Sequence, residues 1–258
     1  MDTRPAVLVT GGARRIGAAI SRRFGHAGWH VVIHYGTSEA DARALSQELP
    51  SAEILACNLA DTNAAQAMVD VLADRLPDWR VLVNCASIFA VDDAAVLDVE
   101  INAQAMAINA RAPALLAQRF LARAKAAGGR RVIQVTDQKL ANPNPDFFSY
   151  TMSKHALAST IPMLSKARRD PRDRVYGLAP GAILPSHDQN EAEAEVSHRL
   201  NLLKRKTGVE EIADAALFLA DGWLASGQTL FVDSGQHLLD QDRDVIYLAR
   251  EGRDGRVT

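Results

Sequence analysis

Short apolar runs recur along the chain and alternate with longer segments in which apolar residues are spaced as on one face of a helix. Short continuous apolar runs are typical of strands buried on both faces, as in parallel sheets. They predict strands at Val7–Thr10, Val31–His34, Ile54–Ala56, Val81–Asn84, Arg131–Thr136, Val175–Ala179 and Leu230–Val232. The periodic segments predict helices at Ile16–Ala27, Glu39–Glu48, Asn63–Arg75, Ile101–Ala127, Ser149–Arg168 and Val209–Leu219.

This alternation predicts an α/β fold: a doubly wound (Rossmann) parallel sheet of about seven strands with helices on both faces. No repeat or linker interrupts it, so we predict one domain over residues 1–258, with 1–90 mainly binding the cofactor. The segment 180–208 exceeds an ordinary connection and predicts a substrate lid. The tail after His237 is charged with an apolar patch at Val245–Leu248, which indicates either a partner-subunit contact or a frayed end.

The 258 residues, 48% hydrophobic and 23% charged, suit one such domain. A net charge of −2 gives no electrostatic footprint for nucleic acid or an anionic membrane. The N-terminus lacks a secretory pattern, and no apolar run approaches the ~20 residues that span a bilayer, so we expect a cytoplasmic protein. Cys57 and Cys85 lack metal-site spacing and sit in apolar runs, which predicts buried free thiols and no metal.

A glycine-rich segment, Thr10–Gly17, follows the first predicted strand and opens a helix. Its glycines allow a sharp turn and a close approach to a pyrophosphate, which the helix N-terminus stabilises. An ordinary glycine-rich turn is the alternative, but the position directly after the first strand favours a dinucleotide site.

The second strand ends in the residues His34 to Ser38, with no carboxylate before Glu39. An Asp or Glu at that strand end normally binds the ribose 2′-hydroxyl of NAD. Its absence removes repulsion against a 2′-phosphate and predicts NADP instead. The candidate donors to that phosphate are Arg14, Arg15, His34, Thr37 and Ser38.

Tyr150 and Lys154 are four residues apart in a predicted helix, which places both on one face. A nearby cation favours phenolate, so we expect the pKa of Tyr150 to be lowered. The same spacing often occurs as a surface pair. Here, however, Asn84–Ser87, Asn109 and the Pro180-Gly181 pair fall in order around it, at or beside the carboxyl edge of the predicted sheet, where α/β proteins bind ligands.

This ordered set resembles the short-chain dehydrogenase/reductase family over essentially the whole chain, although Arg15 replaces a glycine of the family's loop. The resemblance implies that Tyr150 is the proton donor, that Lys154 binds the nicotinamide ribose and supports Tyr150, and that Asn109 holds a proton-relay water. The predicted cofactor-binding residues are Gly11, Arg14, Arg15, Ile16, Gly17, His34, Tyr35, Thr37, Ser38, Asn58, Leu59, Asn84, Ala86, Ser87, Lys154, Pro180 and Gly181.

Asp137 stands where most family members place a serine that binds a substrate carbonyl. An ionised carboxylate repels a carbonyl oxygen and suits a substrate that presents N–H groups or takes a proton on nitrogen. A strand-end Asp that caps a turn is the alternative interpretation.

Several departures together resemble one subfamily, the pteridine reductases and dihydromonapterin reductases. They are Arg15, the His-Tyr-x-x-Ser strand end, the Asn-x-Ala-Ser motif ending at Ser87, and an Asp thirteen residues before Tyr150. The resemblance implies a catalytic set of Asp137, Tyr150, Lys154 and Asn109, and a substrate site formed by Phe89, Asp137, Tyr150 and Arg15. Phe89 would stack on the pterin; core filler is its alternative role. Gly36 and Thr37 stand where pteridine reductases can carry basic groups, so 2′-phosphate affinity is in doubt.

The resulting hypothesis is a reductase that uses NADPH to deliver hydride to a pterin C=N bond. Two alternatives stay open: a carbonyl reductase acting on a ketone, sugar or acyl thioester, and a catalytically idle NADP-binding regulatory protein. The expected partner is a small molecule, with no nucleic acid or membrane. The family's usual assembly through the helices at Ile101–Ala127 and Ser149–Arg168 implies a homotetramer or homodimer.

Overall fold

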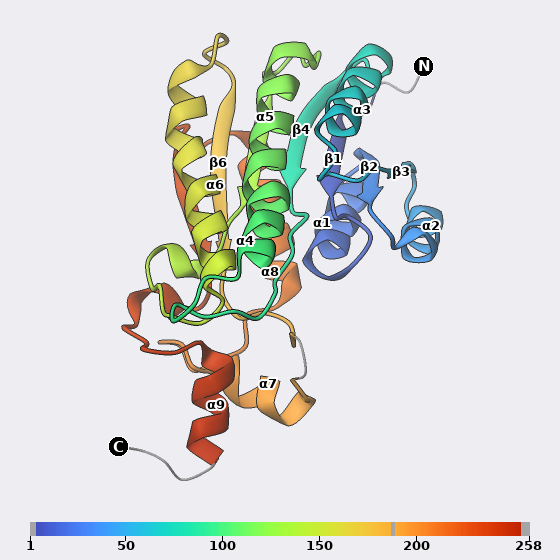
Figure 1. Cartoon of the computed structure of the whole chain (residues 1–258). Helices are drawn as coiled ribbons and strands as arrows, with labels where there is room; N and C mark the ends of the chain where they lie inside the picture. Colours follow the sequence, from blue (N-terminus) through green and yellow to red (C-terminus); the bar gives the residue numbers. More distant parts are fainter. Residues whose placement is uncertain (1–3, 187–188, 254–258) are drawn as a thin grey trace.

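A seven-stranded parallel sheet organises the protein, whose computed structural model describes residues 4–186 and 189–253 (Figure 1). The spatial order is β3-β2-β1-β4-β5-β6-β7, which confirms the predicted doubly wound fold. Its strands are β1 Ala6–Thr10, β2 His30–Tyr35, β3 Ala52–Ala56, β4 Trp79–Asn84, β5 Arg131–Val135, β6 Arg174–Pro180 and β7 Thr229–Val232. The order reverses between β1 and β4, and sheets of this kind bind ligands at the carboxyl edge beside that point.

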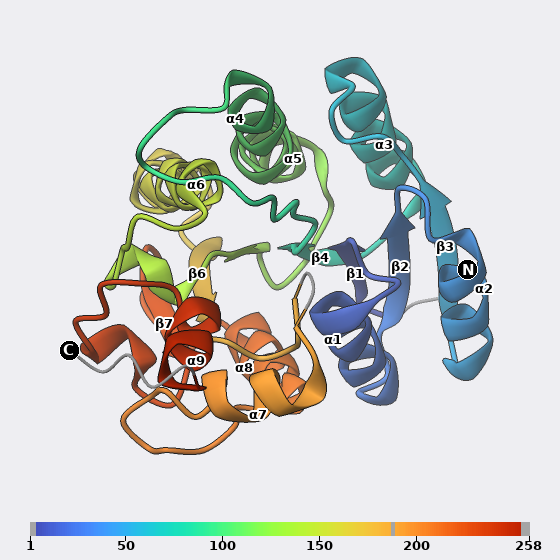
Figure 2. The ribbon, with the colours of Figure 1, turned by 60° about the horizontal axis from the view of Figure 1, so that its bottom comes forward.

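Helices cover both faces of the sheet, as Figure 2 shows. On one face α1 Arg15–His26, α2 Glu39–Glu48 and α8 Val209–Asp221 enclose a core that includes Phe24, Leu45 and Ile212. On the other face α3 Thr62–Arg75, α5 Ala112–Arg123 and α6 Phe148–Ala167 enclose a second core. The strands are apolar on both sides because both of their faces are buried in this way.

The long helix predicted at Ile101–Ala127 is three segments: α4 Val99–Ala105, a π-helical turn η1 Met106–Arg111, and α5. Pro113 lies in the first turn of α5, where a missing N–H is tolerated. Apolar spacing carries no signal for the wider turn, so the sequence prediction merged the three. The π turn contains Asn109, and such turns are frequent at functional sites.

Two short helices at the carboxyl edge were not predicted. The first, α7 Glu191–Ser197, lies within the predicted lid and begins with a capping box between Asn190 and Glu193. The second, α9 Val245–Arg253, contacts α7. Residues 187–188 of the lid, 1–3 of the domain and 254–258 of the tail lie outside the described residues.

Of the two alternatives offered for the tail, the frayed end is wrong for residues 245–253, which form α9, and the partner-subunit contact stays a prediction. Val245 and Ile246 are buried within the chain, and Ile246 packs against the apolar side chains of Phe147 and Tyr150. Across residues 4–186 and 189–253, no helix is long and apolar enough to cross a bilayer. The same ranges contain no cluster of three or more His, Cys, Asp or Glu side chains suited to a metal ion.

Candidate active site

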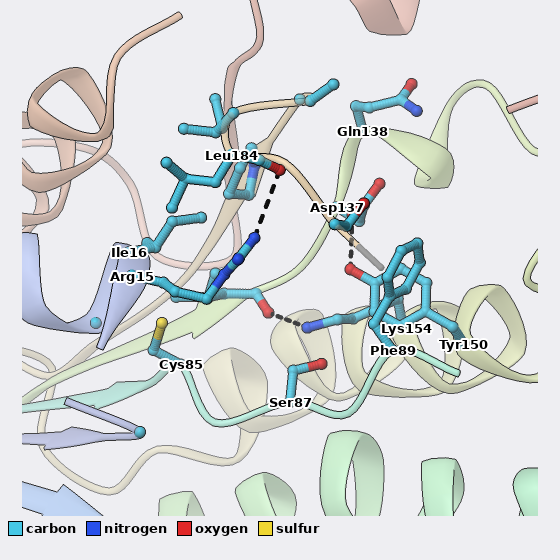
Figure 3. A pocket seen from close by; sticks show the side chains of 18 of the residues that line it. Arg15, Ile16, Cys85, Ser87, Phe89, Asp137, Gln138, Tyr150, Lys154 and Leu184 are labelled. Carbon is cyan, nitrogen blue, oxygen red and sulfur yellow. Dashed lines mark hydrogen bonds between the residues drawn. The ribbon is translucent and has the colours of Figure 1, made fainter. Parts of the chain in front are cut away.

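A cavity of about 410 Å³ opens at the carboxyl edge of the sheet, beside the point where the strand order reverses (Figure 3). Its walls come from the glycine turn, from the segments that follow β2, β4, β5 and β6, from the first turns of α6, and from residues just before and within α9. The topology therefore brings together residues that lie more than two hundred positions apart in the sequence, such as Gly11 and Ile246.

The glycine turn has the shape that a pyrophosphate site needs. Gly11 has φ +62°, and a Cβ there would lie 2.9 Å from Cα of Ala86, while a Cβ on Gly17 would collide with the carbonyl oxygen of Gly11. Arg14 precedes α1 without a side-chain cap, and the first turn of α1 holds no acidic residue. The free N–H groups and positive dipole end of α1 thus face the cavity, so these residues fit the diphosphate of NADP.

Some of the residues predicted to bind the cofactor near its 2′-phosphate line the cavity, while their binding role stays a prediction. Arg14, Arg15, Tyr35 and Ser38 line the cavity. The residues predicted beside them that do not line it are Thr37, Asn58 and Leu59. Leu59 is buried in the core, because it packs beneath α3 rather than at the cavity edge.

The prediction that His34 donates a hydrogen bond to the 2′-phosphate is wrong. Its side chain is only 2% exposed, and burial lowers its pKa. Nδ1 accepts the Gly11 N–H at 3.0 Å, and Nε2 lies 3.0 Å from the Cys57 carbonyl oxygen. The neutral ring therefore supports the glycine turn from behind and does not reach the cofactor.

Arg15 links the glycine turn to the lid. Its Nη2 donates to the carbonyl oxygen of Pro185 at 2.9 Å and, more weakly, to that of Leu184 at 3.4 Å (Figure 3). Burial, and then the charge of Arg14, lower its pKa. Arg15 lines the cavity, and one nitrogen of its guanidinium donates to carbonyl oxygens of the predicted lid segment, while its predicted roles in cofactor and substrate binding stay predictions.

Tyr150 and Asp137 form a short hydrogen bond within the cavity. The Tyr150 hydroxyl donates to Oδ2 of Asp137 at 2.7 Å, and Oδ1 of Asp137 accepts the Lys139 N–H at 2.9 Å. Asp137 thus caps the 3₁₀ turn η2 Gln138–Leu140, as the alternative interpretation proposed, and contacts Tyr150 as well. Burial raises the pKa of Asp137 above its ordinary value, against the hydrogen bond from Tyr150.

The expected lowering of the Tyr150 pKa is wrong for this structure. Burial and then the Asp137 charge raise the pKa of Tyr150 well above its ordinary value. The Lys154 Nζ donates to the Val135 carbonyl oxygen at 2.8 Å and lies over the Tyr150 ring, 5.4 Å from its centroid. Burial also lowers the pKa of the Lys154 ammonium. Lys154 and Tyr150 do line one cavity, as predicted.

Asn109 and Asn84 hold the site from outside the cavity. The Asn109 side chain exchanges two hydrogen bonds with the backbone of Ile88, at 2.8 and 2.9 Å, and donates to Ser153 at 3.0 Å. Asn84 donates to Gln134 at 2.9 Å. The Asn109 bonds fix the loop after β4 against α6, and the Asn84 bond joins β4 to β5. The relay-water role of Asn109 stays a prediction.

Phe89 lies on the cavity wall beside Tyr150. Its ring stacks on Phe147, with centroids 4.1 Å apart, and meets the ring of Tyr150 edge-on at 4.6 Å. It is only partly buried and lines the cavity, so it is available to a flat ligand. The other predicted cofactor-binding residues that line the cavity are Ile16, Gly17, Ala86, Ser87, Pro180 and Gly181.

The two cysteines are less buried than predicted. Both are partly exposed, because each follows a strand end and neither lies within a strand. Cys85 lines the cavity, and burial raises its pKa to about 11.

Sequence reasoning missed a group of cavity residues from η2, the lid and the tail. They are Gln138, Lys139, His198, Asp244, Val245 and Ile246. Lys139 and Asp244 form a buried ion pair at 2.9 Å, although 105 positions separate them (244 minus 139). No local pattern signals such a contact; only the apolar patch beside Asp244 hinted that the tail packs against something.

A dinucleotide turn beside a buried Tyr-Lys pair defines a nicotinamide-dependent oxidoreductase. The chain belongs to the short-chain dehydrogenase/reductase family, since residues 11–237 match the family described as Enoyl-(Acyl carrier protein) reductase. It is similar to pteridine reductase 1 of Leishmania tarentolae, with 25% identity over 92% of this chain and 97% of that protein.

Two solved NADP complexes share the fold. The structure of FolM alternative dihydrofolate reductase 1 from Brucella canis has a TM-score of 0.86 and 32% identity, over 93% of this chain and 96% of that one. The angucycline C-6 ketoreductase LanV has a TM-score of 0.80 and 28% identity, over 91% and 96% of the two chains. The chain is accordingly an NADP-dependent reductase of this family.

Proposed function

We propose that this reductase transfers hydride from NADPH to a C=N bond of a pterin-type substrate, such as a dihydropteridine or dihydromonapterin. The observation that carries the proposal is Asp137, a carboxylate bonded to Tyr150 at 2.7 Å where a carbonyl-binding hydroxyl would serve a ketone. Phe89, available for stacking beside that pair, supports a flat heterocycle. Similarity to a pteridine reductase supports the same substrate class.

The residues of the glycine turn and the N-terminus of α1 bind the cofactor's diphosphate in this proposal, and Arg14 and Ser38 lie at its 2′-phosphate end. The bound cofactor supplies the hydride. Lys154 orients the nicotinamide ribose, and the partly enclosed cavity keeps the reacting atoms close together. Phe89 holds the substrate ring against the cofactor.

Asp137 and Tyr150 supply the proton that the substrate nitrogen takes up. Burial raises the pKa values of both groups, so the pair retains protons at a higher pH than free side chains would. When Asp137 is protonated, the pair carries one proton that can leave without creating a buried phenolate. Tyr150 passes its hydroxyl proton to the ring nitrogen next to the carbon that accepts hydride and takes the Asp137 proton in its place, so Asp137 is left ionised.

The direct test is Tyr150→Phe with NADPH and 7,8-dihydromonapterin. We expect turnover to be abolished while the Kd of NADPH is unchanged, because the hydroxyl contacts Asp137 and no residue of the glycine turn. Tyr176→Phe is the matched control: it removes a hydroxyl that bonds the Leu224 carbonyl oxygen, outside the cavity. Full activity in Tyr150→Phe would contradict the assignment.

A carbonyl reductase is the second candidate, favoured by the similarity to the LanV ketoreductase. NADPH oxidation with dihydromonapterin, dihydrobiopterin, small ketones, a sugar and an acyl thioester separates the two. Activity on the carbonyl compounds alone overturns the pterin proposal. Tight NADPH binding without turnover of any of them would instead indicate an idle regulatory protein.

We propose that the chain is one cytoplasmic domain that assembles as a homodimer or homotetramer. One sheet runs through the described residues, and exposed apolar side chains on α6 and α8 support assembly; they are Met152, Met163 and Phe218. Light scattering at micromolar concentration, one cooperative unfolding transition and cell fractionation check these three points. A monomer, two separate transitions or a membrane fraction would contradict them.

A further inference from the structure

Phe147 is a buried aromatic residue whose backbone is left-handed. It directly precedes α6, has φ +55° and ψ +51°, and is 1% exposed. A left-handed backbone is costly for a large L-residue, because Cβ then approaches the following carbonyl oxygen. Backbones of this kind persist only where surrounding contacts hold them, and they cluster at active sites and ligand sites. The position of Phe147, three residues before Tyr150, fits that pattern.

The segment that carries Phe89 holds this backbone in place. The Phe147 N–H donates to the Asp92 carbonyl oxygen at 2.9 Å, and the Asp92 carboxylate accepts the Ser149 N–H at 3.0 Å. Phe89 lies only three residues before Asp92. These hydrogen bonds therefore join the loop after β4 to the start of α6, and they fix the positions of the two phenylalanines relative to each other.

The Phe147 ring supports the Phe89 ring. The two rings are stacked, with centroids 4.1 Å apart and an angle of 26° between their planes. Phe89 lines the cavity beside Tyr150 (Figure 3), whereas Phe147 does not line it. The Phe147 ring has further neighbours in the Lys139 ammonium, 5.8 Å from its centroid, and the Tyr247 ring, 6.1 Å away. Removal of the Phe147 ring would leave a space behind the cavity wall into which Phe89 can turn.

We propose that Phe147 is a positioning residue for substrate selection: its ring holds Phe89 in the plane in which a flat, ring-shaped substrate stacks. The inference rests on the proposed function in taking Phe89 as the residue that stacks on the substrate. Aromatic pairs depend on the relative orientation of their planes, so a Phe89 ring that turns binds a flat ligand less well. A ring that is fixed before binding also loses little freedom when the substrate arrives. Phe147 thus favours flat substrates over aliphatic ones, and it acts through Phe89.

The test uses Phe147→Leu and Phe147→Met, which keep an apolar side chain and remove the flat ring. With 7,8-dihydromonapterin, we expect KM to rise about three- to tenfold while kcat changes less than about twofold, as for loss of one aromatic contact in substrate binding. The Kd of NADPH should not change, since Phe147 lies outside the cavity wall. Phe120→Leu is the matched control: Phe120 is fully buried against Trp79 in the second core, so its loss should lower the Tm and leave KM unchanged. An unchanged KM in both Phe147 variants, or a parallel rise in the NADPH Kd, overturns the inference.

A double-mutant cycle with Phe89→Leu separates positioning from a merely structural role. If Phe147 acts through Phe89, then Phe147→Leu should raise KM by less than about twofold once residue 89 is already leucine, because the two residues are coupled. Independent effects would instead multiply, and the double variant would show the product of the two single rises in KM. That product overturns the inference, even if each single variant raises KM as expected.

A substrate panel keeps this result separate from the proposed function. Each variant is assayed with every compound that the unmodified protein reduces, sorted by whether it carries a flat ring. If aromatic ketones are reduced and pterins are not, while the cycle shows the coupling, the pterin proposal fails and the role of Phe147 stands. If Phe147→Leu reduces pterins with an unchanged KM, the pterin proposal stands and the role of Phe147 is refuted. Reduction of aliphatic carbonyl compounds alone overturns both.

Discussion

Asp137→Asn isolates the proton-supply role of the Asp137–Tyr150 pair. In the unmodified protein the hydrogen bond from Tyr150 to Asp137 is 2.7 Å long. The amide oxygen of Asn can still accept it, but Asn carries no transferable proton. Asp137 has a pKa above its ordinary value of 3.8, chiefly because of burial. The protonated, proton-supplying form is therefore full below 3.8 and is lost as pH rises through the raised pKa. We expect kcat/KM for reduction to fall with pH through that range.

The magnitude follows from the chemistry. General acid catalysis contributes about 10²- to 10⁴-fold, or roughly 3–5 kcal/mol of barrier, so Asp137→Asn should lose turnover by that factor. The fall of kcat/KM with rising pH (the pH-dependent limb of the rate profile) should also disappear in this variant. Thermal stability gives a second readout, in which the variant should gain where activity is lost. A raised pKa in the folded state means that folding disfavours the ionised carboxylate. The Tm of Asp137→Asn should therefore be no lower than that of the unmodified protein, and the difference should grow in favour of the variant as pH rises.

The assay is steady-state NADPH oxidation with dihydromonapterin from acid to alkaline pH, together with thermal melts in the same buffers. Asp61→Asn is the matched control, because it makes the same chemical change at the N-cap of α3, where Asn also caps well. Asp61→Asn should keep both the turnover number and the fall of kcat/KM with rising pH. Wild-type turnover in Asp137→Asn, or an unshifted limb in that variant, would refute the proton-supply role.

Three further predictions follow from the same structure. Gly11→Ala should raise the Kd of NADPH by tenfold or more in a fluorescence titration, because φ is +62° and the added Cβ meets Ala86; an unchanged Kd contradicts the pyrophosphate site. Cys85, whose pKa is raised to about 11, should react with iodoacetamide at pH 8 far more slowly than a free thiol in mass spectrometry, and rapid alkylation would contradict the raised pKa. Glu211, held at a pKa of about 2 by Arg205, should stabilise α8 above its ordinary pKa of 4.5 and lose that effect as pH falls toward 2. Glu211→Gln should accordingly lower the Tm at pH 7 and not at pH 2. The loss in the free energy of unfolding at pH 7 should be less than about 1 kcal/mol, because the ion pair is exposed.

The sheet was predictable because each strand is a short apolar run buried on both faces, which is a local property. Every predicted strand exists, with ends that differ by at most two residues, as at Trp79 in place of Val81. Tyr150 and Lys154 were also predictable as cavity partners, since helical spacing and the carboxyl edge of a parallel sheet place them. The π turn around Asn109 was not, because its apolar spacing is that of an ordinary helix.

The electrostatics of the site could not be predicted from spacing. Residues four apart on a helix share a face, but the atom that each side chain contacts depends on the surrounding walls. Lys154 finds the Val135 carbonyl oxygen from β5, and Tyr150 finds Asp137 beyond the same strand. Burial then raises the pKa of Tyr150, which the sequence analysis had expected to be lowered. The sign of the shift was set by tertiary contacts.

The position of Asp137 also explains why the tail belongs to the site. A buried carboxylate needs cations or donors nearby, and Lys139, in the turn that Asp137 caps, is one of the two lysines that oppose the rise in its pKa. Lys139 is itself buried, and it is tolerated there because Asp244 pairs with it at 2.9 Å. The tail thus contributes a charge on which the ionisation of the proposed catalytic pair, Asp137 and Tyr150, depends. Loss of Asp244 should therefore disturb the pH dependence of reduction as well as the shape of the substrate cavity.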